Sequence, residues 1–195
     1  TGPSFGNELG RFADISAASG FDLIDDGRAL ARVDWDRDGD LDFWLTNRSA
    51  PRLRLLKNNL TKSASSSWLT ISLQGSTCNR DAIGARVTVK TQQHLYSQSV
   101  RAGDSYLTQS SMRLHFGLAS ANAIENVVVT WPNGHRQEIP NLQPNGLYQV
   151  EEGGATKKIA LPPQPKIARG KRRPLAQDTD GFHRILLRNP LPLNN

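Results

Sequence analysis

Five aspartates alternate with other residues between positions 34 and 42, and their spacing predicts a site for a metal ion. They are Asp34, Asp36, Asp38, Asp40 and Asp42, and Gly39 follows the third of them. Ca²⁺ takes roughly six to eight oxygen ligands, and a glycine at the sixth position of a calcium loop permits the sharp turn that brings later oxygens to the ion. We therefore expect Ca²⁺ as the cofactor, with the Asp40 carbonyl and the Asp42 carboxylate completing the shell.

The residues around this loop exclude a helix-loop-helix calcium site, which needs a bidentate Glu where this chain has Leu45. The flanking segments 29–33 and 41–45 are short, apolar and partly β-branched or aromatic, which is typical of strands. One alternative is a solvated acidic turn without an ion, in which the five carboxylates would repel one another. Another is a Mg²⁺ site, which normally uses fewer carboxylates and keeps several waters.

Short strand-like segments make up most of the remaining sequence, with turn residues about every 8–12 positions. The turn 132–134 joins two of them in a predicted hairpin. This pattern predicts an all-β protein in which a partial propeller-like calcium-loop unit precedes an antiparallel β-sandwich or barrel. Besides the two strands around the loop, the predicted strands are 12–16, 52–56, 68–73, 85–90, 95–100, 114–116, 127–131, 135–139 and 147–150.

The pattern divides the chain into three expected parts. Residues 1–59 form the calcium-binding strand-loop-strand unit, residues 68–153 form the β domain, and residues 154–195 form an extended, basic, proline-rich arm. We expect 147–150 to be the last strand of the β domain. Within the arm, 184–188 is predicted to dock as an edge strand or a short helix.

Charge and hydropathy limit the classes of partner. The chain has a formal charge of +6, and residues 154–195 hold nine basic and two acidic residues, so the rest is close to neutral. The arm could therefore bind an acidic polymer through Lys171, Arg172 and Arg173, and a solvated linker without a partner is the alternative. Nucleic acid is not expected, because no aromatic residues interleave with these charges. No apolar run is long enough for a transmembrane segment. Because the chain begins at Thr1, we expect that it was processed or cut from something longer.

A second group of polar residues surrounds Gly84. Arg80, Asp81 and Arg86 could bind an anionic ligand, but a β-turn with an internal Arg–Asp pair accounts for the same residue types and is the favoured interpretation. No catalytic residues are assigned: the sequence has no Gly-x-Ser-x-Gly motif, and its four histidines have no metal-ligand spacing.

Two parts of the sequence resemble known families. The loop 34–42 resembles the calcium motif of FG-GAP/VCBS repeats, which build β-propellers of extracellular proteins. The blocks 79–87, 103–110, 114–118 and 131–134 resemble, in the same order, the ASPIC/UnbV domain that follows such repeats in cartilage acidic protein-like chains. The resemblance implies calcium binding in the first part and a secreted, extracellular or periplasmic location. A full propeller is missing, and the basic arm lies outside the family pattern.

These observations together favour a non-catalytic, calcium-binding extracellular module for adhesion or ligand binding, whose partner is a protein or a glycan. Two other functions stay open at this point. The chain could be the C-terminal part of a secreted hydrolase, or a polyanion-binding protein that acts through its basic arm.

Overall fold

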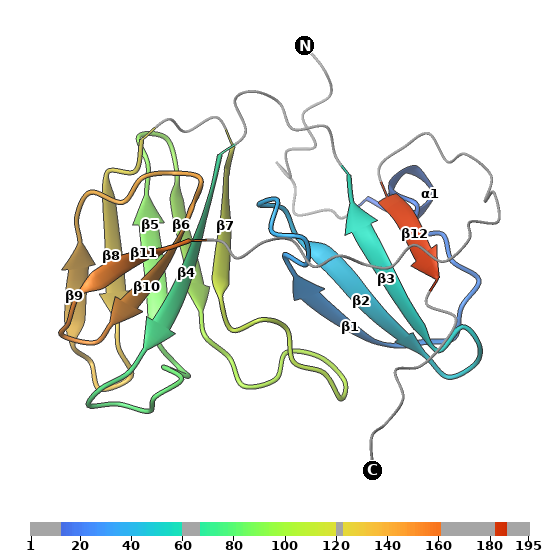
Figure 1. Ribbon diagram of the computed structural model, residues 1–195, viewed down its shortest axis with the longest axis horizontal. Coiled ribbons are helices and arrows are strands. Elements are labelled where there is room, and N and C mark those ends of the chain that lie inside the picture. The colour runs from blue at the N-terminus through green and yellow to red at the C-terminus, as the bar shows by residue number, and fades with distance from the viewer. Residues whose placement is uncertain (1–12, 60–66, 120–122, 161–181, 187–195) are drawn as a thin grey trace.

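The computed structural model describes residues 13–59, 67–119 and 123–160, together with the backbone of 182–186. These residues form three four-stranded sheets, which lie in two groups side by side (Figure 1). The elements are α1 Ser16–Ser19, β1 Gly27–Val33, β2 Asp42–Asn47, β3 Leu53–Asn58, β4 Ser67–Gln74, β5 Arg86–Lys90, β6 Leu95–Ser99, β7 Leu114–Ala119, β8 Asn126–Thr130, β9 Arg136–Ile139, β10 Gly146–Glu151, β11 Thr156–Ile159 and β12 Phe182–Leu186. The prediction of an all-β protein is confirmed.

The predicted strand at 12–16 is wrong for the residues that the structure describes. Residues 13–15 form no strand, and the short helix α1 begins at Ser16. The Asp14 carboxylate accepts a hydrogen bond from the Ser16 amide, and Gly20 ends the helix in a left-handed conformation with φ of 74°. These local bonds at both ends favour one helical turn over a strand.

The first sheet has the strand order β1-β2-β3-β12, with every neighbouring pair antiparallel. Strand β12 pairs with β3 from Phe182 opposite Asn58 to Leu186 opposite Arg54. The predicted edge strand is therefore present for residues 184–186, while residues 187 and 188 lie outside the described part of the chain. A segment of the arm thus completes the sheet that carries the acidic loop.

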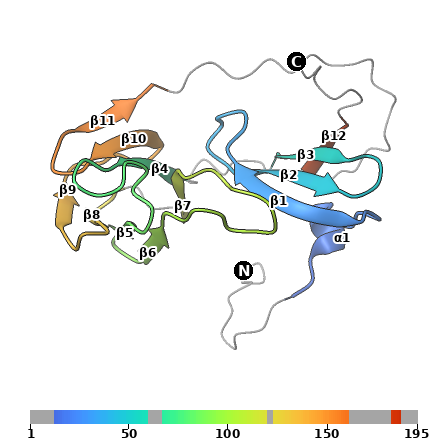
Figure 2. The same ribbon diagram turned by 90° about the horizontal axis from the view of Figure 1, so that it is seen from below.

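The other two sheets stack face to face as a sandwich (Figure 2). Their strand orders are β11-β10-β4-β7 and β6-β5-β8-β9, and the described residues form no closed barrel. Buried residues alternate along β5, β7 and β8, as expected for strands with one face toward a core. The core between the sheets includes Ile71, Val87, Phe116, Val129 and Trp131, all almost fully buried.

One pair of strands in the sandwich departs from the antiparallel prediction. Strand β10 runs parallel to β4, from Gly146 opposite Leu69 to Glu151 opposite Gln74. Between β4 and β10 the chain forms β5 and β6 of the opposite sheet, returns for β7, and then adds β8 and β9 to the opposite sheet. Such a long crossover permits parallel pairing, which a tight hairpin does not. The segment 147–150 is also not the last strand, because β11 follows it and pairs antiparallel with β10.

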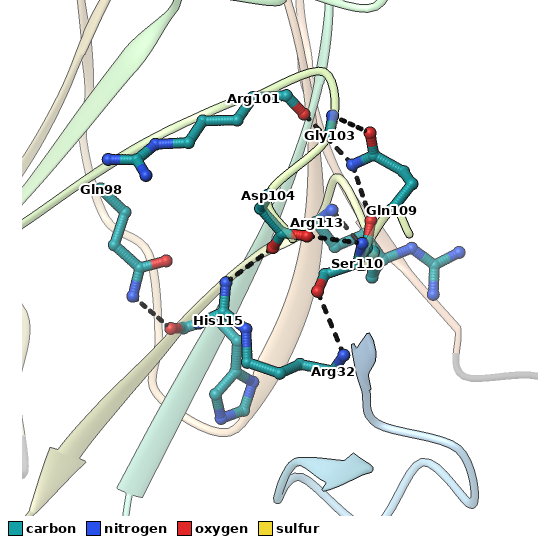
Figure 3. A network of polar contacts seen from close by, with 10 residues as sticks. Arg32, Gln98, Arg101, Gly103, Asp104, Gln109, Ser110, Arg113 and His115 are labelled. Carbon is teal, nitrogen blue, oxygen red and sulfur yellow. Dashed lines mark hydrogen bonds and ion pairs between the residues drawn. The ribbon is translucent and has the colours of Figure 1, made fainter. Parts of the chain in front are cut away.

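The two groups of sheets meet at the end of β1. The Arg32 guanidinium lies 3.1 Å from the Asp104 carboxylate, and the Arg32 amide donates a hydrogen bond of 3.1 Å to the Ser110 hydroxyl (Figure 3). The Ser111 amide in turn donates to the Arg32 carbonyl. Residues 100–113, between β6 and β7, thus reach across from the sandwich to the edge of the first sheet. Among the described residues, no helix is long and apolar enough to cross a membrane.

Candidate metal centre

The acidic loop is the tight connection between β1, which ends at Val33, and β2, which begins at Asp42. Two residues of the loop have positive φ angles, Arg37 at 59° and Gly39 at 91°. This backbone turns sharply enough to return the chain to the antiparallel partner strand, and only glycine adopts such angles without strain. The predicted strands on both sides of the loop are confirmed.

Three of the five aspartates form a compact group. Asp34, Asp36 and Asp42 each offer a carboxylate oxygen within 4.8 Å of the other two. Asp42 is fully buried and Asp36 is 8% exposed. Three carboxylates so close together, two of them buried, repel one another, and a divalent cation between them would cancel that repulsion.

Backbone amides hold two of these carboxylates in place. The Asp42 oxygens accept hydrogen bonds from the amides of Trp35 at 2.9 Å and Asn58 at 2.8 Å. The Asp34 oxygens accept from the amides of Asp38 at 3.1 Å and Gly39 at 3.2 Å. The loop backbone and the end of β3 therefore orient the carboxylates before any ion binds.

Asp36 is held differently and is the best indicator of a cation. One of its carboxylate oxygens pairs with the Lys57 ammonium group, which also lies 4.0 Å from Asp38. The other oxygen, Oδ1, is buried and accepts no hydrogen bond among the described residues. A buried carboxylate oxygen without a partner costs free energy, and a metal ligand bond removes that cost. The residues present therefore fit a hard cation.

Asp38 and Asp40 do not belong to the compact group. An Asp38 carboxylate oxygen accepts a hydrogen bond from the Asp40 amide at 3.2 Å. The structure thus brings together three of the five predicted ligands, and leaves the Asp38 side chain and the Asp40 backbone as the neighbours from which further oxygens would come.

Burial raises the pKa of two carboxyl groups in the cluster. The pKa of Asp34 rises to about 6, first because of burial and then because of the neighbouring aspartates, against the lowering by the Gly39 amide. The pKa of Asp42 is raised as well, mainly by burial. Both shifts mean that the folded chain without a metal disfavours the ionised carboxylates.

The stability of the metal-free protein should therefore depend on pH. A carboxyl group with a raised pKa in the folded state stabilises the fold below its unfolded pKa and loses that contribution as the pH rises through its folded value. For Asp34 this loss falls between the ordinary carboxyl pKa of 3.8 and the folded pKa of about 6. We expect the melting temperature of metal-free protein to fall from about pH 4 to about pH 6, and saturating Ca²⁺ to remove or reverse this trend. Equal slopes with and without Ca²⁺ would contradict the expectation.

Gly39 also fixes the loop against the sandwich. A Cβ atom on Gly39 would overlap the indole ring of Trp68, the second residue of β4, whereas a Cβ on Gly103, at a similar φ of 81°, would meet nothing within 4 Å. We expect Gly103→Ala to cost about 1 kcal/mol from backbone strain alone, and Gly39→Ala to cost roughly 2 kcal/mol more from the overlap. Urea unfolding of both variants measures the difference in the free energy of unfolding. Equal losses would show that the Trp68 side chain moves aside without destabilising the protein.

The residues of the second predicted group, Arg80, Asp81 and Arg86, are all exposed. The Asn79 side chain accepts a hydrogen bond from the Ile83 amide and donates one to the Ile83 carbonyl, which makes the segment a closed turn. The expected Arg–Asp pair is wrong: among the described residues no ion pair joins Asp81 to either arginine, and Arg86 bonds the Ser99 hydroxyl at 3.4 Å. The residues Lys171, Arg172 and Arg173, predicted to bind acidic polymers, lie outside the described part of the chain.

Glu152 is an organising residue that the sequence analysis did not identify. It is 6% exposed, and its two oxygens accept five hydrogen bonds. The donors are the amides of Ser76, Thr77 and Cys78, the Thr77 hydroxyl and the Asn133 side chain, at 2.6–3.0 Å. These bonds, with that of the Thr77 hydroxyl first, hold the pKa of Glu152 far below its usual range. Glu152 thus ties the turn before Asn79 to the 131–134 turn.

Comparison with known protein families gives a match to the sandwich. The family model of ASPIC and UnbV matches residues 75–157, which cover most of the two stacked sheets. The predicted resemblance is confirmed for this part of the chain. The resemblance of the acidic loop to FG-GAP/VCBS repeats has no such match and stays a prediction. No curated protein sequence matches the chain.

Proposed function

We propose that this chain is a calcium-binding, non-catalytic module of an extracellular or periplasmic protein, in which an FG-GAP/VCBS-like unit carries the ion and an ASPIC/UnbV sandwich presents loops to a protein or glycan ligand. The observation that carries the proposal is the group of Asp34, Asp36 and Asp42, which offer carboxylate oxygens within 4.8 Å of one another. The buried Oδ1 atom of Asp36 has no hydrogen-bond partner among the described residues.

The sheet that carries the loop supports the FG-GAP/VCBS-like part of the proposal. It is a single antiparallel sheet of four strands, which is the size and type of one propeller blade. Its acidic loop joins two neighbouring strands at one end of this sheet. Bound there, Ca²⁺ would supply positive charge that ties the loop to the first residue of β2.

The expected affinity of the calcium site supports the proposed extracellular or periplasmic location. Only three carboxylates converge, and one of them already pairs with Lys57, so the affinity should be modest. Calcium sites of extracellular modules have dissociation constants of about 10⁻⁴–10⁻³ M and are filled where calcium is abundant, outside the cytosol. The exposed side chains of Tyr106 and Leu107, on a loop anchored through Asp104, support a ligand-binding role for the sandwich.

Terbium luminescence tests the metal site directly. Tb³⁺ occupies oxygen-rich calcium sites and emits when a nearby tryptophan transfers excitation energy to it, and Trp35 lies between two of the proposed ligands. We expect saturable emission on excitation of tryptophan, displaced by Ca²⁺. The variant Asp36→Asn should lose this emission, whereas Asp81→Asn, an exposed acid outside the group, should keep it. Equal emission from both variants would place the ion elsewhere.

A further inference from the structure

A small pocket lies where the acidic loop meets the sandwich. Its volume is about 40 Å³, enough for a few water molecules or one small polar group. The first sheet and its loop contribute Asp34 and Arg37 to the lining, and the sandwich contributes Trp68, Thr70, Arg113 and His115. The pocket is thus lined by residues from both halves of the described chain, and two of these residues are arginines.

We propose that this pocket binds a small oxyanion, the carboxylate or sulfate group of a ligand, through Arg37 and Arg113. A guanidinium group offers a planar fork of donors that matches such groups, and two arginines in the lining of one small pocket favour a negatively charged occupant. This site is separate from the residues Arg80, Asp81 and Arg86, none of which lines the pocket.

Arg113 is the cation best placed to serve a ligand. It is exposed, directly precedes β7, and its side chain makes no hydrogen bond or ion pair with the described residues. The contrast with Arg32 is clear, because Arg32 is committed to Asp104 at 3.1 Å (Figure 3). An arginine at a pocket wall without an acidic partner in the described chain is available to an anion from solution.

The wall beside Arg113 is rigid and polar. The Thr70 hydroxyl and His115 Nδ1 are 2.9 Å apart, and the His115 ring stacks on Trp68 with ring centres 6.0 Å apart and an angle of 17°. These contacts fix the imidazole and the hydroxyl where they can hydrogen-bond an oxygen atom in the pocket. A preformed wall of this kind reduces the entropy that a ligand would lose in ordering side chains.

Contacts between the first sheet and the sandwich help to fix the positions of Arg37 and Arg113 relative to each other. Besides the ion pair to Asp104, the backbone of Arg32 exchanges hydrogen bonds with Ser110 and Ser111. Ser111 itself lines the pocket, two residues before Arg113. The pocket is therefore held by the same contacts that join the first sheet to the sandwich.

Asp34 connects this pocket to the calcium site, and this part of the inference rests on the proposed function. Its two oxygens accept hydrogen bonds from the loop amides of Asp38 and Gly39. Without a metal, its negative charge opposes an anion in the pocket. Calcium bound to Asp34 would cancel that charge, so the anion should bind more tightly when calcium is present.

Nuclear magnetic resonance titration of the full chain with acetate tests the proposal, at constant ionic strength and with the indole N–H of Trp68 as the reporter. Acetamide, a neutral molecule of the same shape, is the control for non-ionic effects, and methyl sulfate shows whether a tetrahedral oxyanion is preferred to a planar one. The variant Arg113→Gln removes the proposed cation, and Arg101→Gln removes an exposed arginine of the same loop that does not line the pocket.

We expect saturable shifts of the Trp68 signal with acetate or methyl sulfate and none with acetamide. Arg113→Gln should weaken binding about tenfold, and Arg101→Gln should leave it unchanged. No saturation with either anion, or equal losses in the two variants, would overturn the proposal. Anion binding that is the same in metal-free and calcium-loaded protein would remove only the link through Asp34, and failure of the calcium site alone would leave metal-free binding intact.

Discussion

Replacing Asp36 with asparagine should abolish most of the stabilisation that calcium gives this protein. At a calcium concentration about 100 times the dissociation constant, binding stabilises the native chain by about 2.7 kcal/mol, which raises the melting temperature by roughly 5–10 °C. Asp36→Asn removes one of only three converging carboxylates. If affinity falls about 100-fold, the same calcium concentration gives about 0.4 kcal/mol, or less than about 2 °C.

The metal-free stability of this variant should change little. Asparagine keeps an oxygen acceptor for Lys57, and its amide nitrogen can donate to the nearby Asp34 and Asp42 carboxylates. Thermal melts of the native chain, Asp36→Asn and Asp81→Asn, each with chelator and with calcium, separate the two effects. A calcium response in Asp36→Asn as large as in Asp81→Asn would contradict the assignment of Asp36 as a ligand.

Replacing Glu152 with glutamine should destabilise the sandwich strongly, whether or not calcium is present. Glu152 is the acceptor in all five of its hydrogen bonds. The side-chain amide of glutamine would place an N–H donor opposite some of these donors, and those hydrogen bonds would be lost. The 76–78 turn and the 131–134 turn would both lose their common acceptor. We expect the melting temperature to fall by on the order of 10 °C.

The neighbouring residue provides a matched control. Glu151 is exposed, so Glu151→Gln makes the same chemical change one position away and should alter the melting temperature by less than about 2 °C. A lowered pKa means that Glu152 stabilises the fold above its unfolded pKa and that this contribution is lost only on strong acidification. Similar melting temperatures for the two variants between about pH 5 and pH 8 would show that the five bonds contribute little.

The strands were predictable from sequence because their signals are local. Alternation of apolar and polar residues, as in β5 and β8, reflects one buried and one exposed face, and the 132–134 turn fixes the hairpin of β8 and β9. The signal for the acidic loop is also local, because all five aspartates fall within nine residues. The sequence analysis therefore identified most strands and the three converging carboxylates.

The features that the sequence did not predict depend on contacts between segments far apart in the chain. The parallel pairing of β4 with β10, and the bonds from Glu152 to residues 76–78, join positions more than seventy residues apart. Lys57, which pairs with Asp36, lies in β3 and carries no spacing signal that links it to the loop. A run of two glutamates before a glycine is an ordinary turn in sequence, and only the fold shows that the second is buried. Pairing across such distances is set by packing of the whole sandwich, not by local pattern.

Calorimetric titration of the chelator-treated chain with Ca²⁺ tests the central claim most directly. The account predicts one saturable site per chain with a dissociation constant in the range of about 10⁻⁴–10⁻³ M, together with a rise in melting temperature over the same calcium range. Heat that does not saturate, with an unchanged melting temperature at millimolar calcium, would contradict it. In that case the carboxylates of Asp34, Asp36 and Asp42 would be balanced by Lys57 and backbone amides alone.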